Sequence, residues 1–303
     1  MSESLTSYGS KKVNDLIFQM LINAVMAILS LAALLPFILL FTSSLTAESR
    51  LLVDGYSFFP KEWSITAYTY VFRTNGENVF RAYFITVSVT AIGTTLSLLI
   101  APMMAYVLSR KDYNKRKILG FLVFFTMIFN GGLVAQYTMW TRLFMIRNTY
   151  FALIFPNLLF NGFHIMLMRS YFSMNIHPSL IEAAKIDGAG ELAIYYKIVI
   201  PLSLPIFATI GLMVGINYWN DWQNGLYYVS NARLFSIQNL LNRILQNARF
   251  LATISSSVNV QVELPSIGIR MAMAVIGALQ VMALYPFFQR YFIKGITLGG
   301  VKE

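Results

Sequence analysis

Charged residues are scarce in this chain, and cysteine is absent. Lys, Arg, Asp and Glu make up 12% of the 303 residues, whereas 57% are hydrophobic. A soluble domain carries roughly 25% charged residues, so this composition predicts a membrane protein. The lack of cysteine excludes disulfides and thiolate metal sites. A net charge of +10 would favour nucleic-acid binding in a soluble protein, but here the basic residues mostly flank apolar segments, where they act as topology signals. We therefore expect contact with membrane lipid and no nucleic-acid partner.

The residue patterns of nucleotide hydrolysis and metal catalysis are also missing. The sequence contains no G-x-x-x-x-G-K-[ST] loop to hold ATP phosphates. The two histidines, His164 and His177, are far apart in the sequence, and neither belongs to a metal-spaced cluster. No nucleophile is accompanied by a base. The sequence therefore predicts a protein that is not an enzyme, with no catalytic residue, no metal site and no cofactor of its own.

Long runs without Asp, Glu, Lys or Arg mark the candidate membrane spans. A bilayer core of about 30 Å takes roughly 20 helical residues. Six runs are long enough, which predicts an all-α membrane protein with six transmembrane helices. The runs are Leu16–Ala47, Ala82–Ser109, Ile118–Thr141, Asn148–Met168, Ile198–Asn220 and Met271–Gln289.

The lysines set the expected orientation of these spans. Six spans place both termini on one side, and nine of the ten lysines lie in segments on that side. The positive-inside rule then makes both termini cytoplasmic. The expected layout is an N-terminal tail (1–15), a six-span domain (16–293) and a C-terminal tail (294–303). The domain includes a cytoplasmic loop at 171–201 and an external loop at 223–265.

A charged stretch, EAAKIDGAGELAIYYKIVIP (182–201), separates the fourth and fifth spans. Asn175 or His177 is suited to cap a helix whose first turn holds Pro178. Gly188 is placed to end that helix in a left-handed conformation. The pattern predicts a helix followed by a tight turn, and an ordinary connecting loop is the alternative.

Charges and a second helix complete this predicted hairpin. Glu182 lies near the start of the first helix, where a carboxylate suits the helix dipole, and Lys185 lies within its reach on the same face. A second short helix is expected over Glu191–Val199, before Pro201 marks the return to the membrane.

The hairpin resembles the EAA loop of permease subunits of binding-protein-dependent ABC importers. The resemblance rests on seven residues at fixed spacing: Glu182, Ala183, Ala184, Gly188, Ile198, Ile200 and Pro201, with Ile200 where the family usually has Leu. It implies the type I importer permease fold with a cytoplasmic coupling helix, which docks on a separate ATPase dimer. ATP and Mg would be bound by those partner subunits. The residues that the resemblance assigns to coupling are Glu182, Ala183, Ala184, Asp187 and Gly188.

Three further segments are similar to carbohydrate-importing members of that family. They are 59–72, Trp219–Trp222 and the tail Gly295–Lys302. The similarity implies a bacterial cytoplasmic-membrane permease for oligosaccharides of the maltose, multiple-sugar or polyuronate type. It also implies a second, unlike permease and an extracytoplasmic solute-binding protein, although a permease homodimer stays open. The C-terminal tail would reach the ATPase interface.

Aromatic rings beside amides and a carboxylate suggest where a sugar passes. The candidates for the substrate pathway are Asn217, Trp219, Asn220 and Asp221 at the outer end of the fifth span. An anchoring belt of aromatic residues at the membrane interface is the alternative. A segment at 234–251 has Leu and Ile at helical spacing, with arginines on its other face. This segment resembles the loop of carbohydrate-importing permeases that approaches the binding protein and its ligand site, which implies the same contact here; resting on the outer membrane surface is the alternative.

Polar residues inside the spans are expected to form hydrogen bonds between helices rather than to bind ligand. They are Asn130, Gln136, Asn161, His164 and Gln280. A stand-alone secondary transporter is disfavoured because all six spans lack Asp, Glu, Lys and Arg, which coupling ions normally require. An importer of the same family for peptide, amino acid or phosphate is the closer alternative.

Overall fold

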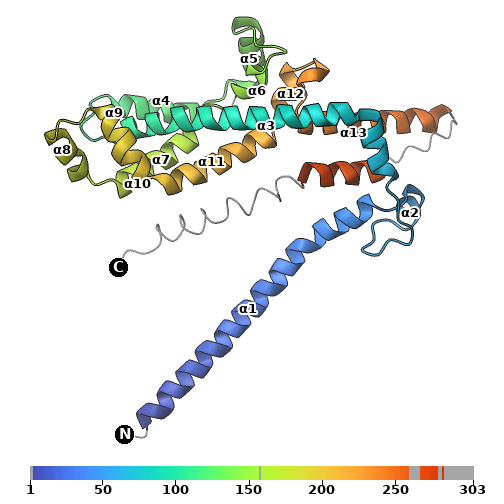
Figure 1. Ribbon diagram of the computed structural model, residues 1–303, viewed down its shortest axis with the longest axis horizontal. Helices are drawn as coiled ribbons and strands as arrows, with labels where there is room; N and C mark the ends of the chain where they lie inside the picture. Colours follow the sequence, from blue (N-terminus) through green and yellow to red (C-terminus); the bar gives the residue numbers. More distant parts are fainter. Residues whose placement is uncertain (1–2, 157, 259–266, 279–281, 283–303) are drawn as a thin grey trace. The chain divides into compact units, whose positions relative to one another are not determined.

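The computed structural model describes residues 3–156, 158–258, 267–278 and 282, and its regular structure there is helical (Figure 1). The chain divides into two units, 1–74 with 248–276 and 75–247 with 277–303, and each is described by itself. The α-helices are α1 (Glu3–Ser44), α2 (Glu48–Val53), α3 (Thr66–Ser109), α4 (Arg116–Ile128), α5 (Gly132–Thr138), α6 (Phe151–Ile154), α7 (Gly162–Asn175), α8 (Pro178–Ile186), α9 (Glu191–Ile194), α10 (Ile200–Leu202), α11 (Leu204–Trp219), α12 (Gln223–Tyr228) and α13 (Ile237–Val258). Two π-helical turns, Met139–Leu143 and Tyr195–Val199, a 3-10 turn, Ala232–Leu234, and an apolar helix, Ile267–Ala278, complete the set.

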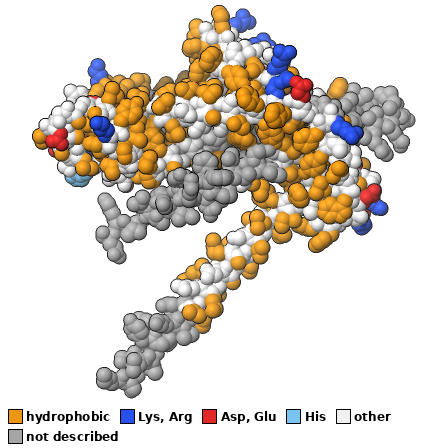
Figure 2. Space-filling model, in the orientation of Figure 1, with side chains coloured by type: hydrophobic (Ala, Val, Ile, Leu, Met, Phe, Trp, Pro, Cys, Tyr) orange, Lys and Arg blue, Asp and Glu red, His pale blue; other side chains and the backbone are white. Residues whose placement is uncertain are grey.

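The first unit contains α1, α2, the beginning of α3 and the last described helix. Hydrophobic side chains stay exposed along α1 from Leu16 onward (Figure 2). The chain after α1 is held by one antiparallel bridge between Thr46 and Trp63. The Glu48 carboxylate accepts the N–H groups of Ile267 and Gly268 at 2.9 and 2.8 Å. It therefore caps the last described helix, whose first N–H groups have no partner within the helix itself.

In the second unit, α3, α4, α7 and α11 approach closely at glycines. A Cβ at Gly93 of α3 would lie 2.4 Å from the Tyr218 ring of α11, and one at Gly211 of α11 would lie 3.1 Å from Leu98. Gly211 and Gly215 form the G-x-x-x-G pattern of the fifth predicted span, and Gly215 faces Thr94 of α3. The close helix approach that such glycines permit is therefore present between α3 and α11.

Several predicted spans are interrupted in the structure. Two described helices are long and apolar enough to cross a membrane, within Leu16–Ser44 and Gly76–Ser109, or up to four if two bent pairs each count as one span. The third predicted span bends by 113° between α4 and α5, and the fifth bends by 82° between α10 and α11. The six-span count stays a prediction.

The fourth predicted span, 148–168, differs from a continuous helix. Helix α6 ends at Ile154 and α7 begins at Gly162. Pro156 lies in the break and has no N–H for a helical hydrogen bond. The sixth run is described only to residue 278 and at 282; Gln280 and the tail 294–303 lie outside the described residues.

Candidate functional site

The predicted hairpin forms at 177–199, and its first helix has the expected ends. The His177 side chain caps α8 by accepting the Ser179 N–H, and Pro178 occupies the first turn. Asn175 does not cap the helix, because its amide donates to the Tyr171 carbonyl. At the other end Gly188 has φ +81°, and the Gly188 and Ala189 N–H groups donate to the carbonyls of Lys185 and Ala184. This pair of bonds is the Schellman termination, which favours glycine at that position.

The second arm of the hairpin is less regular than predicted. Helix α9 covers only Glu191–Ile194, and a π-helical turn over Tyr195–Val199 leads into α10. The prediction of a helical segment ending near Pro201 is confirmed, but its pitch changes midway. Ile194 and Val199 are fully buried, so this arm is anchored in the second unit.

The five residues assigned to coupling lie together on the first arm and its turn. None of the residues of α8 is buried. Apolar side chains are exposed on both sides of the turn, with Leu180, Ile186 and Leu192 at 45%, 86% and 65% exposure. The hairpin therefore presents an uncovered apolar and charged surface at one end of the second unit.

Four charged side chains join the hairpin to the end of α3. Arg110 contacts Asp112 at 2.5 Å and Glu191 at 3.1 Å, and Lys185 contacts the same two carboxylates at 3.1 and 3.0 Å. Each charge thus has two neighbours of opposite sign, and we call this arrangement the four-charge ring. The Tyr106 hydroxyl adds a bond to Glu191 at 2.8 Å. Lys185, expected within reach of Glu182 on the same helix face, forms its ion pairs with Asp112 and Glu191.

The ring shifts the ionisation of its members. Hydrogen bonding to the Arg110 guanidinium holds the pKa of Asp112 well below its usual range. Hydrogen bonds to Glu191 and Asp112 raise the pKa of Lys185. A cavity of about 410 Å³ lies between the ring, α7 and α8, lined in part by Phe172, Ile181 and Glu182. The ring therefore stays charged at neutral pH, with the cavity beside it.

The four substrate-pathway candidates lie at the opposite end of α11 from the hairpin, and they do not converge. Asn217 and Asn220 are exposed, whereas Trp219 is buried. Asp221 accepts the N–H groups of Gln223 and Asn224, both at 3.1 Å, and so begins α12. Burial raises the pKa of Asp221 to about 6. Asp221 therefore has a structural role in holding the turn into α12.

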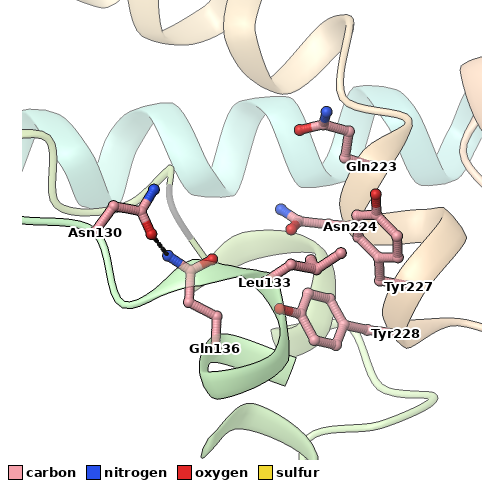
Figure 3. A pocket seen from close by; sticks show the side chains of 7 residues that line it. All are labelled: Asn130, Leu133, Gln136, Gln223, Asn224, Tyr227 and Tyr228. Carbon is pink, nitrogen blue, oxygen red and sulfur yellow. Dashed lines mark hydrogen bonds between the residues drawn. The ribbon is translucent and has the colours of Figure 1, made fainter. Parts of the chain in front are cut away.

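A second cavity, of about 280 Å³, lies at this end between α5 and α12 (Figure 3). Asn130 and Gln136, predicted to bond between helices, line it and bond to each other at 3.3 Å. Tyr227 and Tyr228 also line it and are residues that sequence reasoning missed. The break at Asn130-Gly131-Gly132 was a signal that this part of the third span bends.

Asn161 and His164 are the other polar residues predicted within spans that the structure describes. Asn161 caps α7 by accepting the N–H groups of Phe163 and His164. His164 is buried, at 4% exposure. Within the described residues, no group of three or more His, Asp or Glu side chains is placed to hold a metal ion.

Comparison with known proteins identifies the family. No family model matches the chain. A polygalacturonan/rhamnogalacturonan transport system permease protein of Bacillus subtilis, YtcP, is 36% identical over 286 residues, which cover 94% of this chain and 98% of the relative. The chain is a carbohydrate ABC transporter permease. The permease is also 32% identical to the protein LplC of Bacillus subtilis over the full length of both chains. An arabinooligosaccharide permease of the same bacterium, AraQ, is 27% identical and matches 94% of this permease.

A solved structure supports the same assignment. The permease superposes with a TM-score of 0.75 on a chain of a bacterial ABC transporter involved in the import of the acidic polysaccharide alginate. The two are 28% identical, and the match covers 92% of the permease and 98% of that chain. The all-helical fold is therefore that of an ABC importer permease, and the predicted family is confirmed.

Proposed function

We propose that this permease is one of two unlike transmembrane subunits of an ATP-driven oligosaccharide importer in the bacterial cytoplasmic membrane. The two permeases enclose the pathway, an ATPase dimer binds ATP and Mg on the cytoplasmic side, and a solute-binding protein delivers the sugar outside. Both termini of the permease are cytoplasmic in this proposal. The names of the relatives, which are transport permeases for sugars, favour an oligosaccharide over a peptide, amino acid or phosphate.

The observation that carries the proposal is the exposed hairpin fastened to α3. Its outer surface, from Glu182 to Gly188, is uncovered and suited to dock in a cleft of the ATPase. Its inner side is joined to Arg110 and Asp112 by the four-charge ring. A movement of the ATPase would then reach α3, one of the long apolar helices, through a short charged connection. Coupling of this kind needs two distinct sites and an element that links them.

The external loop 223–265 fits contact with the binding protein. The apolar face of α13 is covered by the chain itself, since Ile237, Leu240 and Ile244 are buried. That burial leaves no apolar face on this part of the helix to rest on lipid. Arg243 is held by Asn239 and lies over the Phe235 ring at 4.2 Å, so its position is fixed.

A co-purification experiment tests the proposal. The tagged permease is extracted gently from its native membrane, and its partners are identified by mass spectrometry. We expect an ATPase, a second permease and a binding protein. The Gly188→Val variant should no longer co-purify with the ATPase, because a β-branched residue resists φ +81°. The Gly190→Val variant, changed in extended backbone two residues further on, should still co-purify with it. Recovery of the permease alone, or with itself only, would contradict the proposed assembly.

A further inference from the structure

The cavity between α5 and α12 lies where the chain after the α4–α5 bend approaches the end of the fifth predicted span. It is lined by the side chains of Asn130, Leu133, Gln136, Gln223, Asn224, Tyr227 and Tyr228 (Figure 3). Six of these seven carry an amide or a phenol, and none carries a charge. Amides and phenols each supply donors and acceptors without charge, so this lining is chemically suited to a neutral polar ligand.

Tyr228 contributes a phenol to the cavity. The residue is 1% exposed, and its ring stacks on Tyr137 with centroids 5.9 Å apart and planes 12° apart. Its side chain lines the cavity together with that of Tyr227 (Figure 3). A phenol both donates and accepts a hydrogen bond, so the two tyrosines add both capacities to the cavity lining.

Hydrogen bonds hold the Asn224 and Asn130 amides in place around Tyr228. The Asn224 amide is 3% exposed and donates to the Pro156 carbonyl at 3.0 Å. Its side chain extends from α12 toward Asn130 and Gln136 (Figure 3). The Asn130 oxygen accepts from the Gly132 N–H and the Gln136 amide. The Asn130 amino group and the side chain of Gln223 form no hydrogen bond with the described residues.

We propose that this cavity binds one residue of the transported oligosaccharide through its hydroxyl groups, an inference that rests on the proposed importer function. A sugar hydroxyl both donates and accepts, as amides and phenols together require. A carboxylate inside the cavity would lose water without meeting a cation, so an acidic sugar would keep its carboxylate outside. The volume, about 280 Å³, is just below the roughly 300–1,000 Å³ of drug-sized ligand sites, which limits the occupant to about one ring.

The test uses the complete importer in proteoliposomes, with its partner permease, ATPase and binding protein. The probes are arabinotriose, trigalacturonate and the methyl ester of trigalacturonate. Tyr228→Phe and Gln223→Ala should each raise the concentration for half-maximal uptake roughly 3- to 10-fold, the loss of one or two neutral hydrogen bonds. The factor should be the same for the acid and its ester. Tyr150→Phe, which removes a half-exposed hydroxyl outside the cavity, should change nothing.

Each contrary result has a distinct meaning. Unchanged uptake in both cavity variants, with a working unmodified importer, overturns the sugar site and leaves the importer function standing. An effect confined to the acid overturns recognition through hydroxyls. No ATP-dependent uptake of any probe by the unmodified assembly overturns the importer proposal and this inference with it. If Tyr228→Phe fails to assemble, Gln223→Ala decides the question, because Gln223 is exposed.

Discussion

The Lys185 ammonium group and the Glu191 carboxylate lie 3.0 Å apart across the turn that Gly188 forms. The same two groups contact Asp112 and Arg110, both in the loop after α3. Isolated exposed ion pairs are worth about 0–1 kcal/mol. Here the Arg110 side chain is only 10% exposed, so one member of the ring is held in the protein interior while the other three contact solvent. We infer that it sets the position of the hairpin on the second unit.

Arg110→Gln should loosen the hairpin without unfolding the protein. The change leaves Asp112 and Glu191 each with Lys185 as their remaining cation. Because both carboxylates are more than half exposed, we expect a local loss of about 1–2 kcal/mol rather than the larger cost of breaking a buried pair. Hydrogen exchange over 178–199 should become faster, and transport per ATP hydrolysed should fall. Lys111→Gln is the matched control, and equal effects of the two changes would contradict the role of the ring.

Exchanging the charges of Lys185 and Glu191 should fail to restore the hairpin. An isolated ion pair survives such an exchange, because opposite charges still face each other. In the ring, Lys185→Glu places two carboxylates together at Asp112, and Glu191→Lys places a second cation against Arg110. The double variant should therefore show faster exchange over 178–199 than either single variant. Recovery to the original exchange rate would show that the two residues act as a simple pair.

The ends of the hairpin could be predicted from sequence, but the ring could not. His177, Pro178 and Gly188 act on backbone groups within a few residues of themselves, so their effect is visible in the local pattern. The local pattern placed Lys185 within reach of Glu182, its neighbour on the helix. Its partner Asp112 is 73 residues earlier in the sequence and is brought there by packing. Charge alone does not reveal such a pairing.

Prediction from sequence has the same limit at the outer end of the fifth predicted span. The stretch around Trp219 has the composition of a sugar site, but Trp219 is buried and Asp221 bonds the backbone of α12. The cavity instead joins residues from either side of a bend with residues of the next loop. The glycines at 131 and 132 indicate the bend, yet its angle of 113° decides which side chains meet. The polar residues of the third predicted span could be recognised in the sequence, but the cavity that they share could not.

Asp221 should make the stability of the protein depend on pH near 6. Its pKa is raised to about 6 by burial, against about 3.9 in an unfolded chain. The unfolded state then releases its proton first as pH rises, so the contribution of Asp221 to stability is greatest below about pH 4 and falls until about pH 6, by roughly 2–3 kcal/mol. Asp221→Asn keeps an oxygen for the N–H groups of Gln223 and Asn224 and should remove this dependence. Thermal unfolding of the purified protein between pH 4 and 7 measures it, and an unchanged slope in the variant would contradict the assignment.

Gly93→Ala should separate α3 from α11. The added Cβ would lie 2.4 Å from the Tyr218 ring, whose hydroxyl donates to the Ile154 carbonyl at 2.8 Å. The ring cannot withdraw without losing that bond, so we expect a loss of about 1–3 kcal/mol, typical of overpacking. Gly76→Ala, in the same helix with nothing within 4 Å, should instead stabilise by about 0.5–1 kcal/mol through helix propensity. Thermal unfolding of the two variants compares them directly.

Adding Tyr218→Leu to Gly93→Ala should cost less than the sum of the single changes, because the leucine removes the clash as well as the bond. Strictly additive losses would mean that the glycine and the tyrosine do not meet.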